Sequence, residues 1–360
     1  MKIIIYLGHP AQYHFFKNIV KNLQRNNQVR YLIKTKDVLE SLLISDNAAY
    51  KNILPKGRQS TKTGVIWGLV KREIRVLFEV LKFKPDLMLG ADPSIAHVGK
   101  LLKVPTLTVL EDDVHVINDL AKITFPFSTH IVAPDSCDCG RWNYKKISYA
   151  GYMKLAYLHP NYFKHGKYEN TVEKTALVRL SNLDAYHDDG IRGFDTNLLR
   201  QVINKLSMDF KVLLSSEKQL DSVFAKYLLK IQPEDMHKVI YNASVLVSDS
   251  QSMTMEAAML GIPSIRYSDF AGRIGVLEEL EHKYRLTFGV KPGNPEKLNK
   301  ILESLLSITD LREEFQKRRK RMLLDKIDVT GFFTWLIENY PDSIRKMHDS
   351  PDYQYNFMTS

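Results

Sequence analysis

Cysteine is nearly absent from the 360 residues: the chain has two, Cys137 and Cys139, one residue apart. Two cysteines cannot build the disulfide framework that small secreted domains use. Their C-x-C spacing has no second cysteine pair to complete a tetrahedral zinc site. We therefore expect a protein of a reducing compartment without a cysteine zinc site.

Long apolar runs are missing as well. A membrane-spanning helix needs about 20 apolar residues, and charged residues interrupt each apolar run of this chain sooner. The first apolar segment, Ile3 to Leu7, is too short for the core of an export signal and suits a first strand. The sequence predicts a cytoplasmic location, with the inner face of the plasma membrane as a more specific alternative.

Negative charge is in the minority. The 51 Lys and Arg exceed the 41 Asp and Glu, for a net charge of +10 and an isoelectric point of about 9.2. Such a balance favours anionic partners, namely nucleic acid, acidic lipid or phosphorylated substrates. No zinc-finger, RNP or basic-zipper pattern accompanies the charge, so we expect no nucleic-acid partner.

The chain does contain short β-branched runs that alternate with longer helical patterns. In the first half these runs cover 2–8, 29–35, 86–92, 106–112 and 130–135. The alternation is typical of βαβ units and a parallel sheet. In such sheets ligands bind beyond the carboxyl ends of the strands, so the residues at those ends are the candidates for a site.

A second series of runs follows a polar stretch at 163–174. Its predicted strands cover 175–181, 210–216, 238–250, 264–268 and 283–290. The sequence thus predicts an α/β fold of two Rossmann-like domains facing across a cleft, the GT-B architecture. We place the N-terminal domain at 1–165 and the C-terminal domain at 175–308, and we expect the helices of 309–360 to pack back on the first domain.

A serine-rich turn leads from an apolar run into the Met- and Ala-rich helix that contains Glu256. A helix N-terminus offers free N–H groups and positive potential, which suit the diphosphate of a nucleotide. The predicted contacts are Ser250, Gln251, Ser252 and Met253. Glu256 would then accept hydrogen bonds from ribose hydroxyls. The alternative is an ordinary N-cap serine followed by a polar helix residue.

Other candidate donor-binding residues lie at the ends of the second series of strands. Arg179 interrupts an apolar strand, and its planar fork suits phosphate oxygens; Arg266 resembles it more weakly. Ser215, Ser216 and Glu217 end the next strand, either near the nucleotide or as a helix cap.

Three residues of the first domain are candidates for a base that takes the proton of an attacking hydroxyl. His9 follows the first strand and His14 lies in the helix after it. Histidine titrates near neutrality, which suits this role, although capping or packing would also explain both residues. Glu111, at the end of another strand, is the carboxylate alternative.

The segment 64–82 has apolar residues at helical spacing together with Trp67 and a stripe of cations. The cations are Lys71, Arg72, Arg75 and Lys82. One interpretation is a helix that lies on an anionic membrane face. The other is a helix that packs its apolar face into the core and leaves its charges in water.

Four stretches of the chain resemble the DUF354 family of predicted glycosyltransferases. They are GHPAQYHFFKNIV, YAGYMKLAYLHPNYF, the run from SSEKQL through IQPEDMHKVIYNASVLVSDSQSMTMEAAMLGIPSIR, and DVTGFF. The likeness covers about residues 1–340. That family is similar to the UDP-N-acetylglucosamine 2-epimerases and to the transferase that makes lipid II.

The resemblance implies a GT-B enzyme that needs no metal or cofactor and moves a sugar from a nucleotide diphosphate, UDP above all, to a glycan or lipid-linked acceptor. It also supports Glu256 as a ribose ligand. Asp92, Glu111 and His187 resemble the acid/base set of the epimerases. However, the epimerase-type HRxEN run reads HDDGI here, and Gln251 and Ser252 replace the paired glycines of many relatives.

Overall fold

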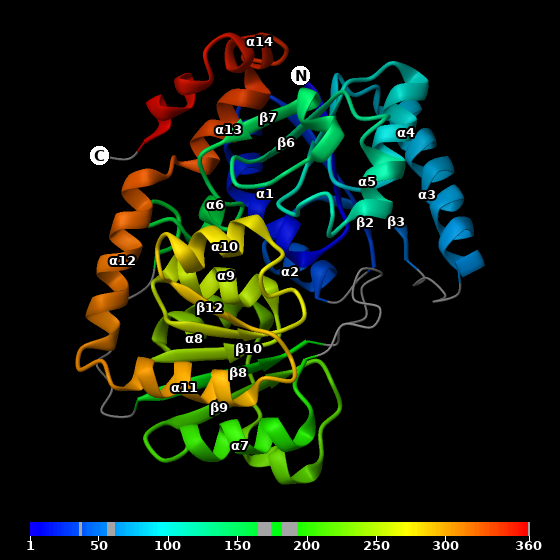
Figure 1. The fold of residues 1–360 in the computed structure, drawn as a ribbon. Coiled ribbons are helices and arrows are strands. Elements are labelled where there is room, and N and C mark those ends of the chain that lie inside the picture. Colours follow the sequence, from blue (N-terminus) through cyan, green and yellow to red (C-terminus); the bar gives the residue numbers. More distant parts are fainter. Residues whose placement is uncertain (36–37, 56–61, 165–173, 182–192, 359–360) are drawn as a thin grey trace. The chain divides into compact units, whose positions relative to one another are not determined.

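The computed structural model describes residues 1–35, 38–55, 62–164, 174–181 and 193–358, with the side chains of 62–66 excepted. These residues form two compact units. Unit 1 consists of 1–157 and 326–360, and unit 2 of 158–325. Each unit is a parallel α/β sheet with helices on both faces, which confirms the predicted fold class (Figure 1).

Unit 1 contains a seven-stranded sheet in the order β3-β2-β1-β4-β5-β6-β7. Its strands are β1 (Lys2–Leu7), β2 (Gln28–Lys34), β3 (Tyr50–Leu54), β4 (Leu87–Leu89), β5 (Thr106–Val109), β6 (His130–Pro134) and β7 (Lys146–Tyr149). Each pairing is parallel, as the predicted βαβ units require. The order reverses at β1 and β4, so the carboxyl ends of these two strands form the switch point.

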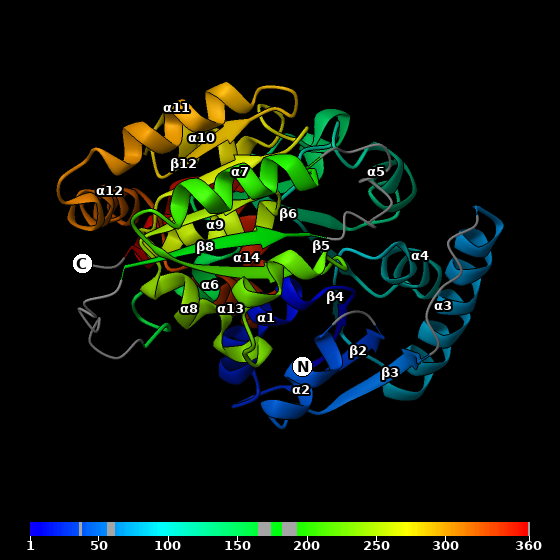
Figure 2. The same ribbon diagram turned by 90° about the horizontal axis from the view of Figure 1, so that it is seen from below.

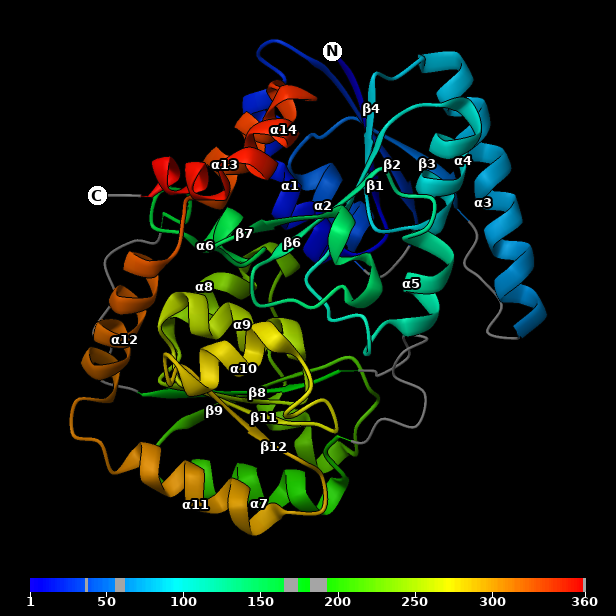
Figure 3. The same ribbon diagram turned by 45° about the horizontal axis from the view of Figure 1, so that its top comes forward.

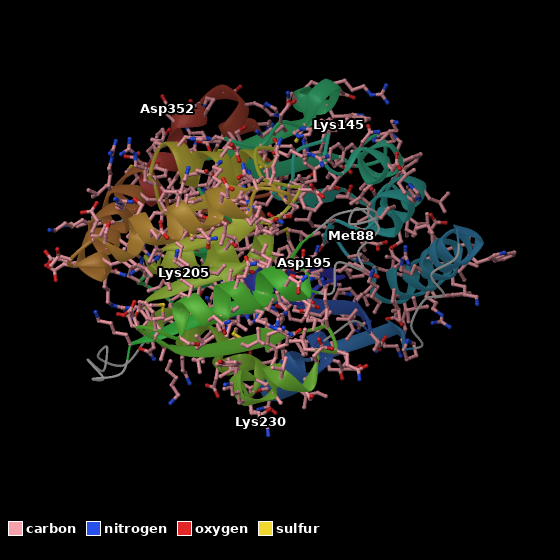
Figure 4. All side chains as sticks on the ribbon, turned by 60° about the horizontal axis from the view of Figure 1, so that its bottom comes forward. Met88, Lys145, Asp195, Lys205, Lys230 and Asp352 are labelled. Atoms are coloured by element: carbon pink, nitrogen blue, oxygen red, sulfur yellow. The ribbon has the colours of Figure 1, made fainter. Side chains whose placement is uncertain are left out.

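Helices cover both faces of this sheet (Figure 3). One face carries α1 (Pro10–Leu23), α13 (Val329–Glu338) and α14 (Asp342–Asp349), and the other carries α3 (Lys62–Phe83), α4 (Pro93–Leu102) and α5 (Asn118–Thr124). The short helices α2 (Leu39–Ser45) and α6 (Leu155–Leu158) complete the unit. Met88 of β4 is fully buried in the core that α3 and α4 close, and it is labelled in Figure 4.

Unit 2 contains a five-stranded sheet in the order β12-β11-β10-β8-β9. Its strands are β8 (Thr175–Leu180), β9 (Lys211–Ser216), β10 (Val245–Ser248), β11 (Ser264–Tyr267) and β12 (Thr287–Val290). The helices α7 (Thr196–Leu206) and α11 (Pro295–Leu306) cover one face, while α8 (Met236–Asn242), α9 (Gln251–Leu260) and α10 (Gly275–His282) cover the other. Helix α12 (Leu311–Asp325) ends the unit. Asp195, labelled in Figure 4, caps α7 by accepting a hydrogen bond from the Leu198 N–H at 2.8 Å.

The predicted strand at 238–250 is wrong in its first half. Residues Met236–Asn242 form α8, and the strand is confined to Val245–Ser248. The β-branched Val239 and Ile240 suggested a strand, but Ile240 and Tyr241 instead form the buried face of a helix that packs on α9. Tertiary packing overrides local propensity here.

Helix α3 packs on the core as one interpretation of 64–82 expected, but mostly through other side chains than the spacing predicted. Val76 and Val80 point into the core, whereas Val70, Ile74, Phe78 and Leu81 are exposed. The periodicity was real, but the side of the helix that meets the core is opposite to most of its apolar stripe. Among the described residues, no helix combines the length and the apolar character that crossing a bilayer requires.

Candidate functional site

The switch point of unit 2 lies where β8 separates β9 from β10. Arg179 stands beside Ser215 of β9 and Ser248 of β10 in the strand register. Parallel strands bring their carboxyl ends to one edge of the sheet, and the crevice at a switch point is where such sheets bind ligands. The structure therefore gathers Arg179, Ser215 and the turn after β10 at one edge.

Arg179 is held at this edge by two partners. Its NH1 donates a hydrogen bond to Ser215 Oγ at 2.7 Å, and its NH2 forms an ion pair with Glu217. Its Nε is buried and has no hydrogen-bond partner in the described residues. One donor of the guanidinium fork thus remains available beside the turn that follows β10. Ser216 lies next to this group and accepts a hydrogen bond from the Lys218 N–H at 3.0 Å.

Asp249, directly after β10, is a site residue that the sequence reasoning did not single out. It is fully buried, and its Oδ1 accepts a hydrogen bond from the Ser181 N–H at 2.7 Å. Its Oδ2 has no hydrogen-bond partner in the described residues, with Lys218 Nζ 4.0 Å away. Burial raises the pKa of this carboxyl above its usual value, against the effect of the Ser181 hydrogen bond and of Lys218. An acidic residue at the end of an apolar run was the available signal.

The N-terminus of α9 forms the third side of the site. Ser250 is the N-cap, and its side chain accepts a hydrogen bond from the Met253 N–H at 3.4 Å. Gln251 Nε2 donates to Ser268 Oγ at 2.9 Å, while the buried Gln251 Oε1 has no hydrogen-bond partner among the described residues. The first-turn N–H groups of Gln251 and Ser252 have no acceptor within the helix, as at any α-helix N-terminus. The capping interpretation of Ser250 is thus confirmed, and it is compatible with an anion at the same turn.

Two substitutions of Ser250 separate its capping role from anion binding. Ser250→Ala removes the cap and should lower the free energy of unfolding by about 1 kcal/mol. Ser250→Asp keeps a capping oxygen and should retain the stability, but its negative charge should weaken pyrophosphate binding about tenfold or more. Thermal melts and calorimetric titration with pyrophosphate measure the two effects. Equal pyrophosphate affinity in Ser250→Asp and the parent would place the anion elsewhere.

Glu256 is buried one turn further along α9. Its Oε1 lies 3.2 Å from Nε2 of His237, on the adjacent helix α8. His237 is a second residue that the sequence reasoning missed, because nothing in the spacing of 237 and 256 indicates that α8 and α9 pack together. The contact with His237 does not test the predicted ribose contact, which stays a prediction.

Arg266 of β11 is the most deeply buried cation of the described residues. It is fully buried, and its three side-chain nitrogens lack hydrogen-bond partners there. Glu278 Oε1 lies 3.6 Å from its NH2. Burial lowers the pKa of the guanidinium, while Glu281 and Glu278 oppose this effect. Arg266 adds positive charge beneath the sheet edge but is closed off from solvent.

The histidine candidates of unit 1 lie at and beyond the carboxyl end of β1. His9 is exposed and is the N-cap of α1, with its Nδ1 accepting a hydrogen bond from the Ala11 N–H at 3.2 Å. This bond requires the neutral ring to carry its proton on Nε2. His14 is half-buried on α1, with its ring centroid 5.3 Å from that of Tyr157.

Glu111, the carboxylate candidate for the base, follows β5, which is two strands away from β1 in the sheet. It is buried, and its Oε2 lies 2.8 Å from Lys154 Nζ while its Oε1 accepts a hydrogen bond from the Met153 N–H at 2.5 Å. Burial raises the pKa of the Glu111 carboxyl, and the Lys154 ammonium opposes this. Both carboxylate oxygens are thus engaged by the chain itself, which suits a structural charge pair better than a base.

Asp92 is also engaged. It caps α4 by accepting hydrogen bonds from the N–H and the hydroxyl of Ser94, and it lies 3.3 Å from Arg72 Nε in a largely buried ion pair. His187 lies outside the described residues. Among the residues that are described, no three His, Cys, Asp or Glu side chains form a group that could hold a metal ion.

Comparisons with known proteins yield structural similarity alone. No protein-family model and no curated protein matches the chain. The structure of S. aureus MnaA with UDP is 14% identical with a TM-score of 0.70, covering 96% of this chain and 98% of that one. UDP-GlcNAc 2-epimerase from Neisseria meningitidis, bound to UDP-GlcNAc, is 14% identical with a TM-score of 0.63, covering 96% and 100%.

A third solved structure is described as a glycosyltransferase rather than an epimerase. The glycotransferase of kitacinnamycin is 12% identical with a TM-score of 0.60, covering 94% of this chain and 98% of that one. At such identities the likeness shows a shared fold, and it extends over nearly the full length of each chain. The chain thus has the GT-B fold of these structures.

Proposed function

We propose that the protein is a GT-B glycosyltransferase that takes a sugar from a nucleotide diphosphate, UDP above all, and passes it to a cell-surface polysaccharide or lipid-linked acceptor. Unit 2 binds the nucleotide in this proposal, and unit 1 supplies the groups that act on the acceptor. The resemblance to the DUF354 family, which rests on sequence stretches alone, points the same way. The ligands of two similar structures, UDP and UDP-GlcNAc, point the same way.

One observation carries the proposal: polar atoms without hydrogen-bond partners among the described residues gather at the carboxyl edge of unit 2. They are Arg179 Nε, Asp249 Oδ2 and Gln251 Oε1, at the ends of β8 and β10 and at the start of α9. Buried polar atoms nearly always have hydrogen-bond partners, and an unpartnered one costs about 1–3 kcal/mol. The Arg179 donor and the helix N-terminus suit phosphate oxygens, and the two acceptors suit hydroxyl groups. Together they suit a ligand that has both.

The state of the two carboxylates in unit 1 favours the transferase over 2-epimerisation. An epimerase-type mechanism would use Asp92 and Glu111 as acid and base. Here Asp92 is paired with Arg72 and caps α4, and Glu111 is paired with Lys154. A general base must be able to reach the proton that it takes, and neither side chain is disengaged. UDP-GlcNAc 2-epimerase activity remains the second candidate because structures of such enzymes are similar to this chain.

The base of the transferase is then one of the two histidines. His9 is exposed at the switch point of unit 1, whereas His14 is half-buried. His9→Asn keeps an N-cap acceptor and removes the titrating ring, so it tests chemistry without removing the cap. His14→Gln is the matched variant on the same helix. The variant that abolishes turnover while retaining nucleotide affinity identifies the base.

The test of the proposal is a panel of nucleotide sugars incubated with the purified chain. We expect UDP to raise the melting temperature, and we expect a UDP-sugar to release UDP faster when a glycan or polyprenyl-phosphate acceptor is present. Proton NMR of the same mixtures detects a C2 epimer directly. A C2 epimer formed without acceptor would replace the transferase with the epimerase. Binding without either product would leave a nucleotide-sugar-binding protein, and no binding of any nucleotide would overturn the proposal.

A further inference from the structure

The outer face of α3 carries a continuous apolar row that faces solvent. The two aromatic side chains, Trp67 and Phe78, are 67% and 65% exposed. The aliphatic side chains Ile74 and Leu81 are 48% and 53% exposed. These positions recur at helical spacing and cover about 21 Å along the helix axis. The opposite face of the same helix, with Val76 and Val80, already fills the core. The outer row is therefore a second apolar face that the described residues of unit 1 leave uncovered.

Cations border this row along one side. Lys71, Arg75 and Lys82 are exposed, and at 100° per residue they lie on a single flank of the apolar row. The acidic residues of the helix, Glu73 and Glu79, are only partly exposed and pair with His97 and Arg30. The outer face of α3 thus presents apolar and positively charged groups together.

The location of α3 leaves this face open within unit 1. Figure 2 shows α3 at the margin of the unit beside β3, with α4 packed on its inner side. In the views of Figures 1 and 3 the helix is likewise the outermost element of its layer.

We propose that the outer face of α3 docks on an anionic lipid membrane. Exposed Trp and Phe rings are the side chains that enter the interface of a bilayer, and Lys and Arg beside them meet acidic headgroups. A second copy of the chain fits this face less well. Antiparallel face-to-face pairing of two α3 helices would bring two rows of Lys71, Arg75 and Lys82 together.

This inference does not depend on the proposed transferase activity. If the acceptor is lipid-linked, docking through α3 holds the enzyme at the surface where that acceptor lies. The membrane test uses no nucleotide, and the nucleotide test uses no membrane, so either proposal can fail alone.

The experiment is co-sedimentation of the full chain with vesicles of phosphatidylcholine, with and without about 30% phosphatidylserine. We expect binding to the anionic vesicles that falls as salt rises, with little binding to the neutral ones. Trp67→Ser/Phe78→Ser and Lys71→Glu/Lys82→Glu should each lower the partition coefficient by about tenfold or more. The control Met208→Ser/Leu324→Ser removes two other exposed apolar side chains, 81% and 58% exposed, and should bind as the parent does.

Circular dichroism and thermal melts of the variants report whether the fold is retained. A parent chain that stays in the supernatant with anionic vesicles overturns the proposal. So does a control variant that loses binding as much as the α3 variants. A concentration-dependent dimer that Trp67→Ser/Phe78→Ser dissociates, without vesicle binding, would assign the face to a second copy instead.

Discussion

Arg179→Ala should weaken UDP binding by about 10- to 100-fold, because a charge-assisted hydrogen bond contributes about 1.5–3 kcal/mol. The side chain has one unpartnered buried donor and lies in register with the end of β10. Its loss removes the cation of the proposed diphosphate site. The fold should tolerate the change, because the partner Glu217 is 48% exposed and such pairs contribute little to stability. Isothermal titration with UDP and thermal melts measure the two quantities.

Two further variants show whether Arg179 acts through its geometry. Arg179→Lys keeps the charge but cannot form the planar fork, so its affinity should lie between those of the parent and Arg179→Ala. Glu217→Gln distinguishes the two roles of that residue. Weaker UDP binding would support the predicted contact between Glu217 and the nucleotide. Tighter binding would show that the Glu217 carboxylate competes with the diphosphate for Arg179. UDP affinity within about twofold of the parent in Arg179→Ala would exclude this edge as the nucleotide site.

Among single substitutions in the ion pairs of unit 1, we expect Lys154→Met to lower the free energy of unfolding most. It leaves Glu111 buried beside Met153 without its cation. Removing one partner of a buried charge pair leaves the other charge uncompensated, which typically costs about 3–5 kcal/mol. The melting temperature should fall by roughly 10 °C.

The pH dependence of this loss is the diagnostic. The pKa of Glu111 is raised in the folded chain. Its contribution to stability is therefore most favourable below the usual value and declines as pH rises toward the folded pKa. In Lys154→Met the decline should be steeper and extend further, so the difference from the parent should nearly vanish near pH 5. The double variant Glu111→Gln/Lys154→Met removes both charges and should recover most of the stability at all pH values. A loss independent of pH would mean that Lys154 stabilises by packing rather than by charge.

Residue patterns sufficed to predict the class of the fold. The apolar runs at 2–8 and 175–181 match β1 and β8, and the helix predicted at 64–82 matches α3. These elements are long or strongly periodic, so local chemistry determines them. The segment 238–250 failed because its first half is a short helix with β-branched residues, whose burial against α9 the sequence does not encode locally.

The candidate site was accessible from sequence only where a strand end or a turn marks it. Arg179, Ser215 and Ser250 each lie at such a position, and the structure brings the first two into contact. Asp249 and His237 were missed because their significance lies in neighbours far along the chain. The partner of Asp249 is Ser181, 68 residues away, and that of His237 is Glu256.

The sequence by itself determined two α/β sheets, a positively charged surface and a capped turn before α9, because these depend on composition, periodicity and spacing. Tertiary structure decided which charges are engaged. Glu111, a candidate base by position, is paired with Lys154, 43 residues later. The apolar row of α3, which looked like core, faces solvent. Periodicity reveals that a helix has an apolar face, whereas only packing reveals which surface that face meets.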